Sequence, residues 1–123
     1  MAYKEALEAA GCEVIAYEEF GSYQGDWLAK VRKDGETFWL RDYYGSCSGC
    51  DAFEADVGWE PWGDDSAEEK AAYAAKVKAF GERMIEPQER LSYDEALAKV
   101  SANVGWDSDA DEMVAWVKAN RDV

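Results

Sequence analysis

The spacing of apolar residues changes after Tyr44, and this change constrains the fold more than any other feature. Before Tyr44, three segments have the character of strands: 12–20 is rich in β-branched and aromatic residues, and the residues of 27–33 and 36–44 alternate between two faces. The dipeptide Asp34-Gly35 lies between the last two segments and is typical of a two-residue hairpin turn. We therefore predict three strands in an antiparallel meander.

Helical patterns occupy the rest of the chain. Residues 2–10 are strong helix formers that end at Gly11, and a loop leads into a short helix within 48–59. Serine followed by glutamate three residues later is a capping-box pattern, and it occurs twice, at Ser66 and Ser92. Two further signals follow: Pro87 ends the first capped helix, and Ser108 or Asp109 opens the last helix.

This order of elements indicates a single α+β domain spanning residues 1–123. We expect a three-stranded antiparallel meander, preceded by a short helix and followed by three or four helices packed on one face of the sheet. Hydrophobic residues make up 48% of the chain, which is enough apolar material for a core of its own.

The charge balance restricts the partners that the domain can bind. Twenty-seven acidic residues against thirteen basic ones give a formal net charge of −14. A polyanion such as nucleic acid would be repelled, as would an anionic membrane surface. A basic protein would be attracted over a long range. Direct binding to nucleic acid or membranes is therefore not expected, whereas a basic protein partner is.

The chain contains no histidine, and this excludes several kinds of active site. Ser-His-Asp and Cys-His catalysis need an imidazole base, and histidine-based metal sites are also ruled out. The sequence has no P-loop, no G-x-G-x-x-G and no G-x-S-x-G pattern. We therefore expect a protein that is not an enzyme and needs no cofactor.

The sequence also suggests a compartment. No window approaches the roughly 18 apolar residues that a membrane span needs. The first twenty residues carry acidic side chains where a signal peptide has a basic start and an uncharged apolar run. We expect the protein to lie in the cytoplasm, where thiols are kept reduced.

Cys47 and Cys50 form a C-x-x-C motif that has three interpretations. A motif of this kind at a helix start can act as a thiol redox site, because the helix N-terminus lowers the thiol pKa. With Cys12 as a third thiol it can contribute to a metal site, although zinc prefers four ligands. The third interpretation is structural: the surrounding glycines and serines suit a sharp turn with small buried side chains.

The same motif carries a resemblance. The string YYGSCSGCDAFEA, preceded by YQGDWLAKV, resembles a segment that recurs in small uncharacterised proteins of tailed bacteriophages and their bacterial hosts. The resemblance covers residues 23–55. It implies a phage or prophage accessory protein and assigns no catalytic residue.

The segment 54–65 is the predicted contact surface. It combines tryptophans, which are common binding anchors, with a dense set of carboxylates. The candidate partner-binding residues are Glu54, Asp56, Trp59, Glu60, Trp62, Asp64 and Asp65.

Together these features favour a non-enzymatic, phage-type accessory protein that binds a basic host protein through an acidic, tryptophan-containing surface. Nucleic-acid mimicry, in which the acidic surface blocks a nucleic-acid-binding groove, is one form that such binding would take. The first alternative is a small C-x-x-C module for thiol redox or metal binding. A second alternative is a phage structural or assembly component.

Overall fold

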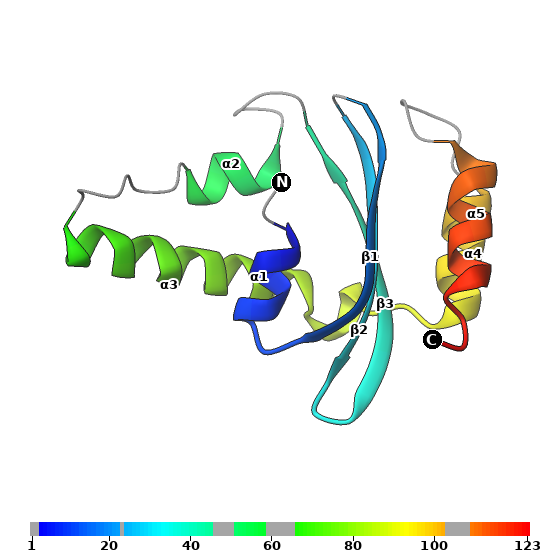
Figure 1. The fold of residues 1–123 in the computed structure, drawn as a ribbon, viewed down its shortest axis with the longest axis horizontal. Helices are drawn as coiled ribbons and strands as arrows, with labels where there is room; N and C mark the ends of the chain where they lie inside the picture. The colour runs from blue at the N-terminus through cyan, green and yellow to red at the C-terminus, as the bar shows by residue number, and fades with distance from the viewer. Residues whose placement is uncertain (1–2, 23, 46–50, 59–65, 103–108) are drawn as a thin grey trace.

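The computed structural model describes residues 3–22, 24–45, 51–58, 66–102 and 109–123. Its order of elements confirms the predicted α+β class: a short helix, a three-stranded antiparallel sheet and then several helices (Figure 1). The elements are α1 (Tyr3–Ala9), β1 (Glu13–Gly21), β2 (Gly25–Lys33), β3 (Glu36–Tyr44), α2 (Ala52–Val57), α3 (Ala67–Met84), the 3₁₀ helix η1 (Pro87–Glu89), α4 (Tyr93–Ser101) and α5 (Ala110–Ala119).

Local sequence signals explain where α1 ends and where the chain turns. Gly11 has a φ of 95°, and the Gly11 and Cys12 amides donate to the Glu8 and Leu7 carbonyls, which is a Schellman motif. Asp34 and Gly35 both have positive φ, 53° and 82°, as a type I′ hairpin turn requires. The predicted end of the first helix at Gly11 and the predicted hairpin turn at Asp34-Gly35 are therefore confirmed.

The predicted helix starts after the sheet are also confirmed where the structure describes them. The Ser66 hydroxyl accepts from the Glu69 amide at the start of α3. At α4, Ser92 and Glu95 form a complete reciprocal capping box. The Ser92 amide donates to the Glu95 carboxylate, and this hydrogen bond lowers the pKa of Glu95.

The sheet is a simple meander in the order β1-β2-β3. The strands pair in register from Glu13↔Arg32 to Gly21↔Gly25, and from Gly25↔Tyr44 to Lys33↔Glu36. A bulge interrupts β1 between Val14 and Ala16. The central strand β2 is therefore covered on both edges, while β1 and β3 each have an outer edge.

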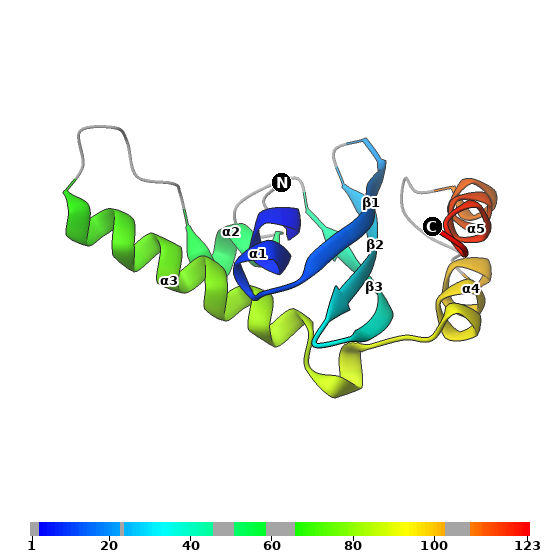
Figure 2. The same cartoon turned by 60° about the horizontal axis from the view of Figure 1, so that its bottom comes forward.

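The helices cover both faces of the sheet, so the expectation of helices on one face is wrong. Figures 1 and 2 show α1, α2 and α3 on one side and α4 and α5 on the other. The physical reason is that the strands carry apolar side chains on both faces of the sheet. Trp27 and Phe38 are buried with the first helical layer, whereas Leu28 and Trp39, their neighbours in sequence, are buried with the second.

The first face holds the larger apolar cluster, and its centre is a stack of aromatic rings. The Trp27 ring lies between Tyr3 and Tyr17, with centroid distances of 5.4 and 5.9 Å. Phe53 and Phe80 continue this packing into α2 and α3. The helices approach closely here, because a Cβ on Gly81 of α3 would come within 1.9 Å of the Ala6 carbonyl oxygen.

The second face holds a smaller cluster with charged groups beneath the helices. Asp26 is completely buried and its carboxylate lies 3.1 Å from the Arg41 guanidinium. Lys30 is also buried, and its ammonium donates to the carbonyls of Asn120, Arg121 and Val123 at 2.8–3.0 Å. Lys30 thereby satisfies carbonyl groups just after the end of α5, where the helix dipole favours a cation.

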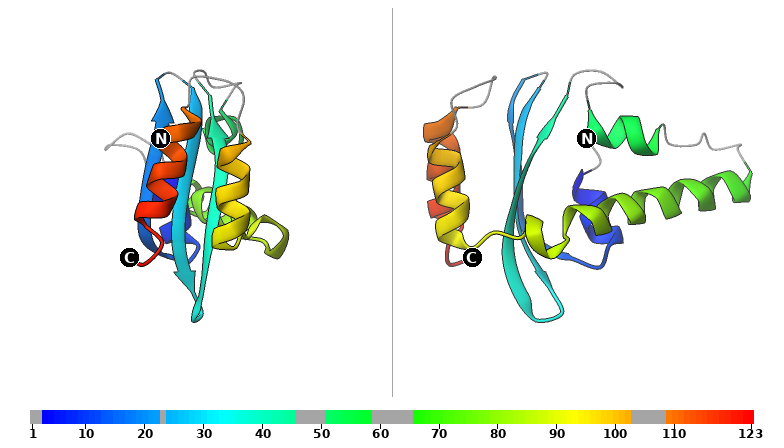
Figure 3. Two further views of the ribbon diagram at one scale, coloured as in Figure 1. Left: turned by 90° about the vertical axis from the view of Figure 1, so that its right-hand side faces the viewer. Right: turned by 180° about the vertical axis from the view of Figure 1, so that it is seen from behind.

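Lys33, a second lysine of β2, also donates to a carbonyl at a helix end, on the α1–α3 face of the sheet. The Lys33 ammonium donates to the Ala10 carbonyl at the end of α1, at 2.9 Å. The connection between layers runs through Leu91, which forms a two-hydrogen-bond bridge with Trp39 at the outer edge of β3. Figure 3 shows this crossing segment passing from α3 to α4 around the sheet.

Candidate binding groove

Most of the contact surface predicted from sequence lies outside the described residues. This applies to Trp59, Glu60, Trp62, Asp64 and Asp65. The two described members, Glu54 and Asp56, lie on α2. The Asp56 carboxylate is 2.8 Å from the Arg83 guanidinium of α3, and both side chains are half exposed. An exposed ion pair of this kind contributes little to stability and does not block access to α2.

Cys47 and Cys50 also lie outside the described residues. The nearest described residues on either side, Gly45 and Asp51, have defined hydrogen bonds. Asp51 is completely buried and caps α2 by accepting from the Glu54 amide at 3.1 Å. The same carboxylate accepts from the Gly45 amide at 3.1 Å and from the Tyr3 hydroxyl at 2.6 Å. Asp51 therefore links Gly45 and the start of α2 to Tyr3 of α1.

The Tyr3 hydroxyl is a permanent donor in this arrangement. Burial raises the pKa of Tyr3 above its ordinary value, and the hydrogen bond to Asp51 raises it further. The phenol therefore stays protonated throughout the neutral range. The Asp51 position of the motif has a structural role that the sequence did not reveal.

Cys12 was the third candidate thiol. It is buried, it is free, and burial raises its thiol pKa. It lies directly before Glu13, at the end of the sheet opposite Tyr44. Among the described residues no group of three or more cysteine, aspartate or glutamate side chains is placed to hold a metal ion.

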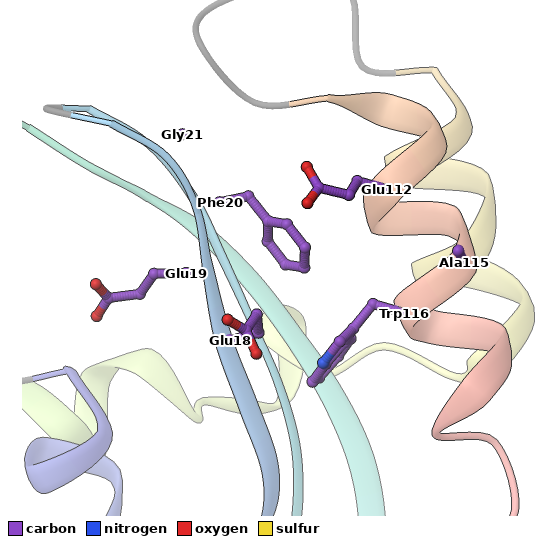
Figure 4. A pocket seen from close by; sticks show the side chains of 7 residues that line it. All are labelled: Glu18, Glu19, Phe20, Gly21, Glu112, Ala115 and Trp116. Carbon is purple, nitrogen blue, oxygen red and sulfur yellow. The ribbon is translucent and has the colours of Figure 1, made fainter.

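The described surface has an open groove between β1 and α5, with a volume of about 570 Å³. Four consecutive residues of β1 and three residues of α5 line it: Glu18, Glu19, Phe20, Gly21, Glu112, Ala115 and Trp116 (Figure 4). The α5 residues follow helical spacing, so their side chains share the side that faces β1. The β1 residues alternate, so the groove reaches the edge of the strand and not only one face.

Two aromatic rings form the floor of the groove. Phe20 and Trp116 meet edge to face with centroids 6.2 Å apart, and Trp116 meets Trp39 in the same way at 6.1 Å. The Tyr44 hydroxyl donates to the Phe20 carbonyl at 2.7 Å and holds this end of β1 in place. The rings are therefore supported from below by the second apolar cluster.

Carboxylates flank these rings. In Figure 4 the side chain of Glu112 extends from α5 toward β1 and that of Glu18 lies at β1, whereas Glu19 points away from α5. Glu18 and Glu112 are exposed, and no described basic side chain lies within ion-pair distance of either one. Glu19 instead accepts from the Tyr17 hydroxyl at 2.7 Å. The groove therefore combines an aromatic floor with two uncompensated negative charges.

The acidic character is uneven across the elements. β1 carries three glutamates and no basic residue, and α5 begins at the N-cap Asp109 followed by Asp111 and Glu112. The α3 helix on the other face carries four basic and three acidic residues. The elements that form the groove are thus more acidic than α3, and this favours the approach of a cation to the groove.

Sequence reasoning did not find this groove. It placed Phe20 in the first predicted strand, 12–20, and Trp116 after the predicted start of the last helix, and it gave no reason to place them together. A signal was present in the i, i+3, i+4 spacing of Glu112, Ala115 and Trp116, which puts an acid beside a ring on one helix face.

Comparison with known proteins found no matching family model, no matching curated protein and no matching solved structure. Among the helices described here, none has the length and apolar character needed to cross a membrane.

Proposed function

We propose that this protein is a non-enzymatic binding protein that engages a basic partner protein through the groove between β1 and α5. The observation that carries the proposal is the pair of exposed carboxylates, Glu18 and Glu112, on either side of the Phe20 and Trp116 rings. A lysine or arginine side chain has the chemistry that fits such a site.

The energetic argument has two parts. A cation over an aromatic ring gains about 0.5–2 kcal/mol, depending on how much water is removed. Two carboxylates that have no described basic partner gain one when the cation arrives, and forming that pair breaks no existing ion pair. The net charge of −14 adds long-range attraction, which speeds association and selects basic partners over acidic ones.

The phage-type role, the cytoplasmic host partner and nucleic-acid mimicry belong to the same proposal. The 54–65 segment is a second predicted contact surface. Its members Glu54 and Asp56 lie on α2. A partner that reached both α2 and the groove would contact opposite sides of the sheet, so the groove alone defines the first test.

The test measures binding of a lysine-rich peptide by fluorescence anisotropy. The double variant Glu18→Gln, Glu112→Gln should weaken binding by about tenfold, which corresponds to about 1.4 kcal/mol. The control variant Glu8→Gln, Glu82→Gln removes the same charge from exposed positions of α1 and α3, and it should change the affinity by less than about threefold. Equal losses in the two variants would show that net charge, and not the groove, attracts the peptide.

Salt and competition then define the kind of partner. Binding through the groove should weaken as ionic strength rises from low to physiological values, because exposed charges are screened. Capture from a bacterial lysate with the wild-type protein and with both variants would identify the partner. Release of that partner by added DNA would support nucleic-acid mimicry, and retention in the presence of DNA would exclude it.

A further inference from the structure

The outer edge of β1 runs along the groove and leads to a more specific inference, which rests on the proposed function. We propose that β1 accepts an extended basic segment of the partner as a fourth strand, with a lysine or arginine side chain placed against the contacting rings of Phe20 and Trp116. The occupant is therefore a basic peptide strand, recognised by backbone pairing and by one side-chain pocket.

The first argument is the position of β1 in the sheet. β1 pairs only with β2 in the three-stranded order, so its other side is an edge. No backbone hydrogen bond links Glu18 or Glu19 to a described segment other than β2. The edge of β3, in contrast, is closed at its centre by the bridge between Trp39 and Leu91. Of the two edges, β1 is the one available for strand pairing along the groove.

The second argument is the direction of the side chains. Glu18 and Phe20 are two residues apart on β1, so they share the face that α5 covers. A residue of an added strand that lies opposite them on this face has its Cβ about 5 Å from theirs. A long basic side chain at that position reaches the Trp116 ring and the Glu112 carboxylate across the groove. Backbone pairing and the pocket are thus compatible in one binding mode.

The third argument concerns which strand can pair. Glu13, Glu18 and Glu19 make β1 an acidic edge, so two copies of this chain that paired edge to edge would bring like charges together. The same residues attract a lysine-rich or arginine-rich strand. The charge that prevents self-association therefore selects the basic occupant.

The experiment compares two peptides of equal charge. One is an alternating lysine–valine peptide, and the other has the same sequence with every second backbone nitrogen methylated, which removes half of its hydrogen-bond donors. Strand addition predicts that methylation weakens binding by about tenfold or more. It also predicts that the unmethylated peptide slows amide hydrogen exchange in β1 while leaving β3 unchanged.

The possible outcomes separate this inference from the proposed function. If both peptides bind equally and both are weakened by Glu18→Gln, Glu112→Gln, the groove binds cations without strand pairing, and strand addition is overturned. If neither peptide binds, the proposed function fails as well. A dimer in sedimentation measurements of the free protein, with β1 amides protected, would identify a second copy as the occupant and overturn the basic strand.

Discussion

The two faces of the sheet are held by different means. On the α1–α3 face, rings from the helices and strands stack into one apolar cluster around Trp27. On the α4–α5 face, the apolar cluster is smaller, and buried or nearly buried charges contact helix ends and each other: Asp26, Lys30 and Arg41. The first layer is dominated by non-directional packing, the second by directional contacts.

This difference teaches how one small domain combines stability with an open surface. Apolar burial contributes most of the free energy of folding, and the larger apolar cluster lies on the first face. On the second face, the hydrogen bonds from Lys30 to the carbonyls after α5 help to set where this helix lies, because hydrogen bonds depend on geometry. They hold α5 near β1 and leave the Phe20–Trp116 groove open between them. The predictions below test this division.

The largest effect should come from the aromatic stack. Trp27→Ala removes the ring that Tyr3 and Tyr17 contact and should lower the free energy of unfolding by about 3–5 kcal/mol. Leu28→Ala, at the next residue but on the other face, removes less volume and should cost about 2–3 kcal/mol. Urea denaturation measures both. A larger cost for Leu28→Ala would contradict the view that the α1–α3 face contributes more.

Lys30 and Lys33, which donate to carbonyls at the ends of α5 and α1, give the next comparison. Lys30→Met keeps the length of the side chain but leaves three carbonyls without their charged donor, and should cost about 2 kcal/mol. Lys33→Met removes one hydrogen bond at a more exposed site and should cost about 0.5–1 kcal/mol. Hydrogen exchange should show α5 amides losing protection in Lys30→Met while α3 amides keep theirs. An equal loss of amide protection in α5 and α3 would show that Lys30 has no particular effect on α5.

The hydroxyl of Tyr3 should have a smaller effect. Tyr3→Phe leaves the ring in place but removes the donor to the buried Asp51 carboxylate, and should cost about 1–2 kcal/mol. Tyr17→Phe is the matched control, since its partner Glu19 is only partly buried, and should cost about 0.5 kcal/mol. Equal costs for the two variants would show that burial of the acceptor does not matter here.

The pH dependence of Tyr3 follows from the same hydrogen bond. Its folded-state pKa is raised, so its stabilising contribution is complete below the ordinary tyrosine pKa of about 10 and is lost as pH rises above that value. Tyr3→Phe should therefore lose less stability than the wild type between about pH 8 and pH 11. The measurement is the unfolding free energy of both proteins at these two pH values. Equal losses of unfolding free energy in the two proteins would contradict the assignment of a raised pKa to Tyr3.

The smallest effect on stability should come from the groove itself. Glu18→Gln, Glu112→Gln changes two exposed side chains without a described ion-pair partner, so the free energy of unfolding should change by less than about 0.5 kcal/mol. Thermal unfolding checks this directly. A large loss of stability would show that these carboxylates support the fold, and it would remove them as specific binding residues.

Much of the fold could be predicted because its signals are local. β-Branched and aromatic residues identified β1, and alternation identified β2 and β3. Asp34-Gly35 identified the hairpin, and Ser66 and Ser92 identified two helix starts. Each signal depends on residues within one turn or one strand, where backbone geometry and side-chain chemistry decide the outcome.

The arrangement of layers and the groove could not be predicted in the same way. Trp39 and Leu28 lie at the polar positions of an alternating pattern, and only the packing of α4 and α5 against them shows that this second set is also buried. Phe20 and Trp116 come from opposite ends of the chain, and no local pattern records their contact. Asp51 likewise gains its role from Tyr3, far away in sequence.

The β2–β3 hairpin turn offers a practical handle for protein engineering. Nothing lies within 4 Å of the position that a Cβ on Gly35 would occupy, and the turn is at the end of the sheet opposite Gly21 and the groove. An affinity tag or a fluorescent domain inserted between Asp34 and Gly35 would extend away from both helical layers. Attached to a sensor surface at this tip, the molecule would present the groove to the solution.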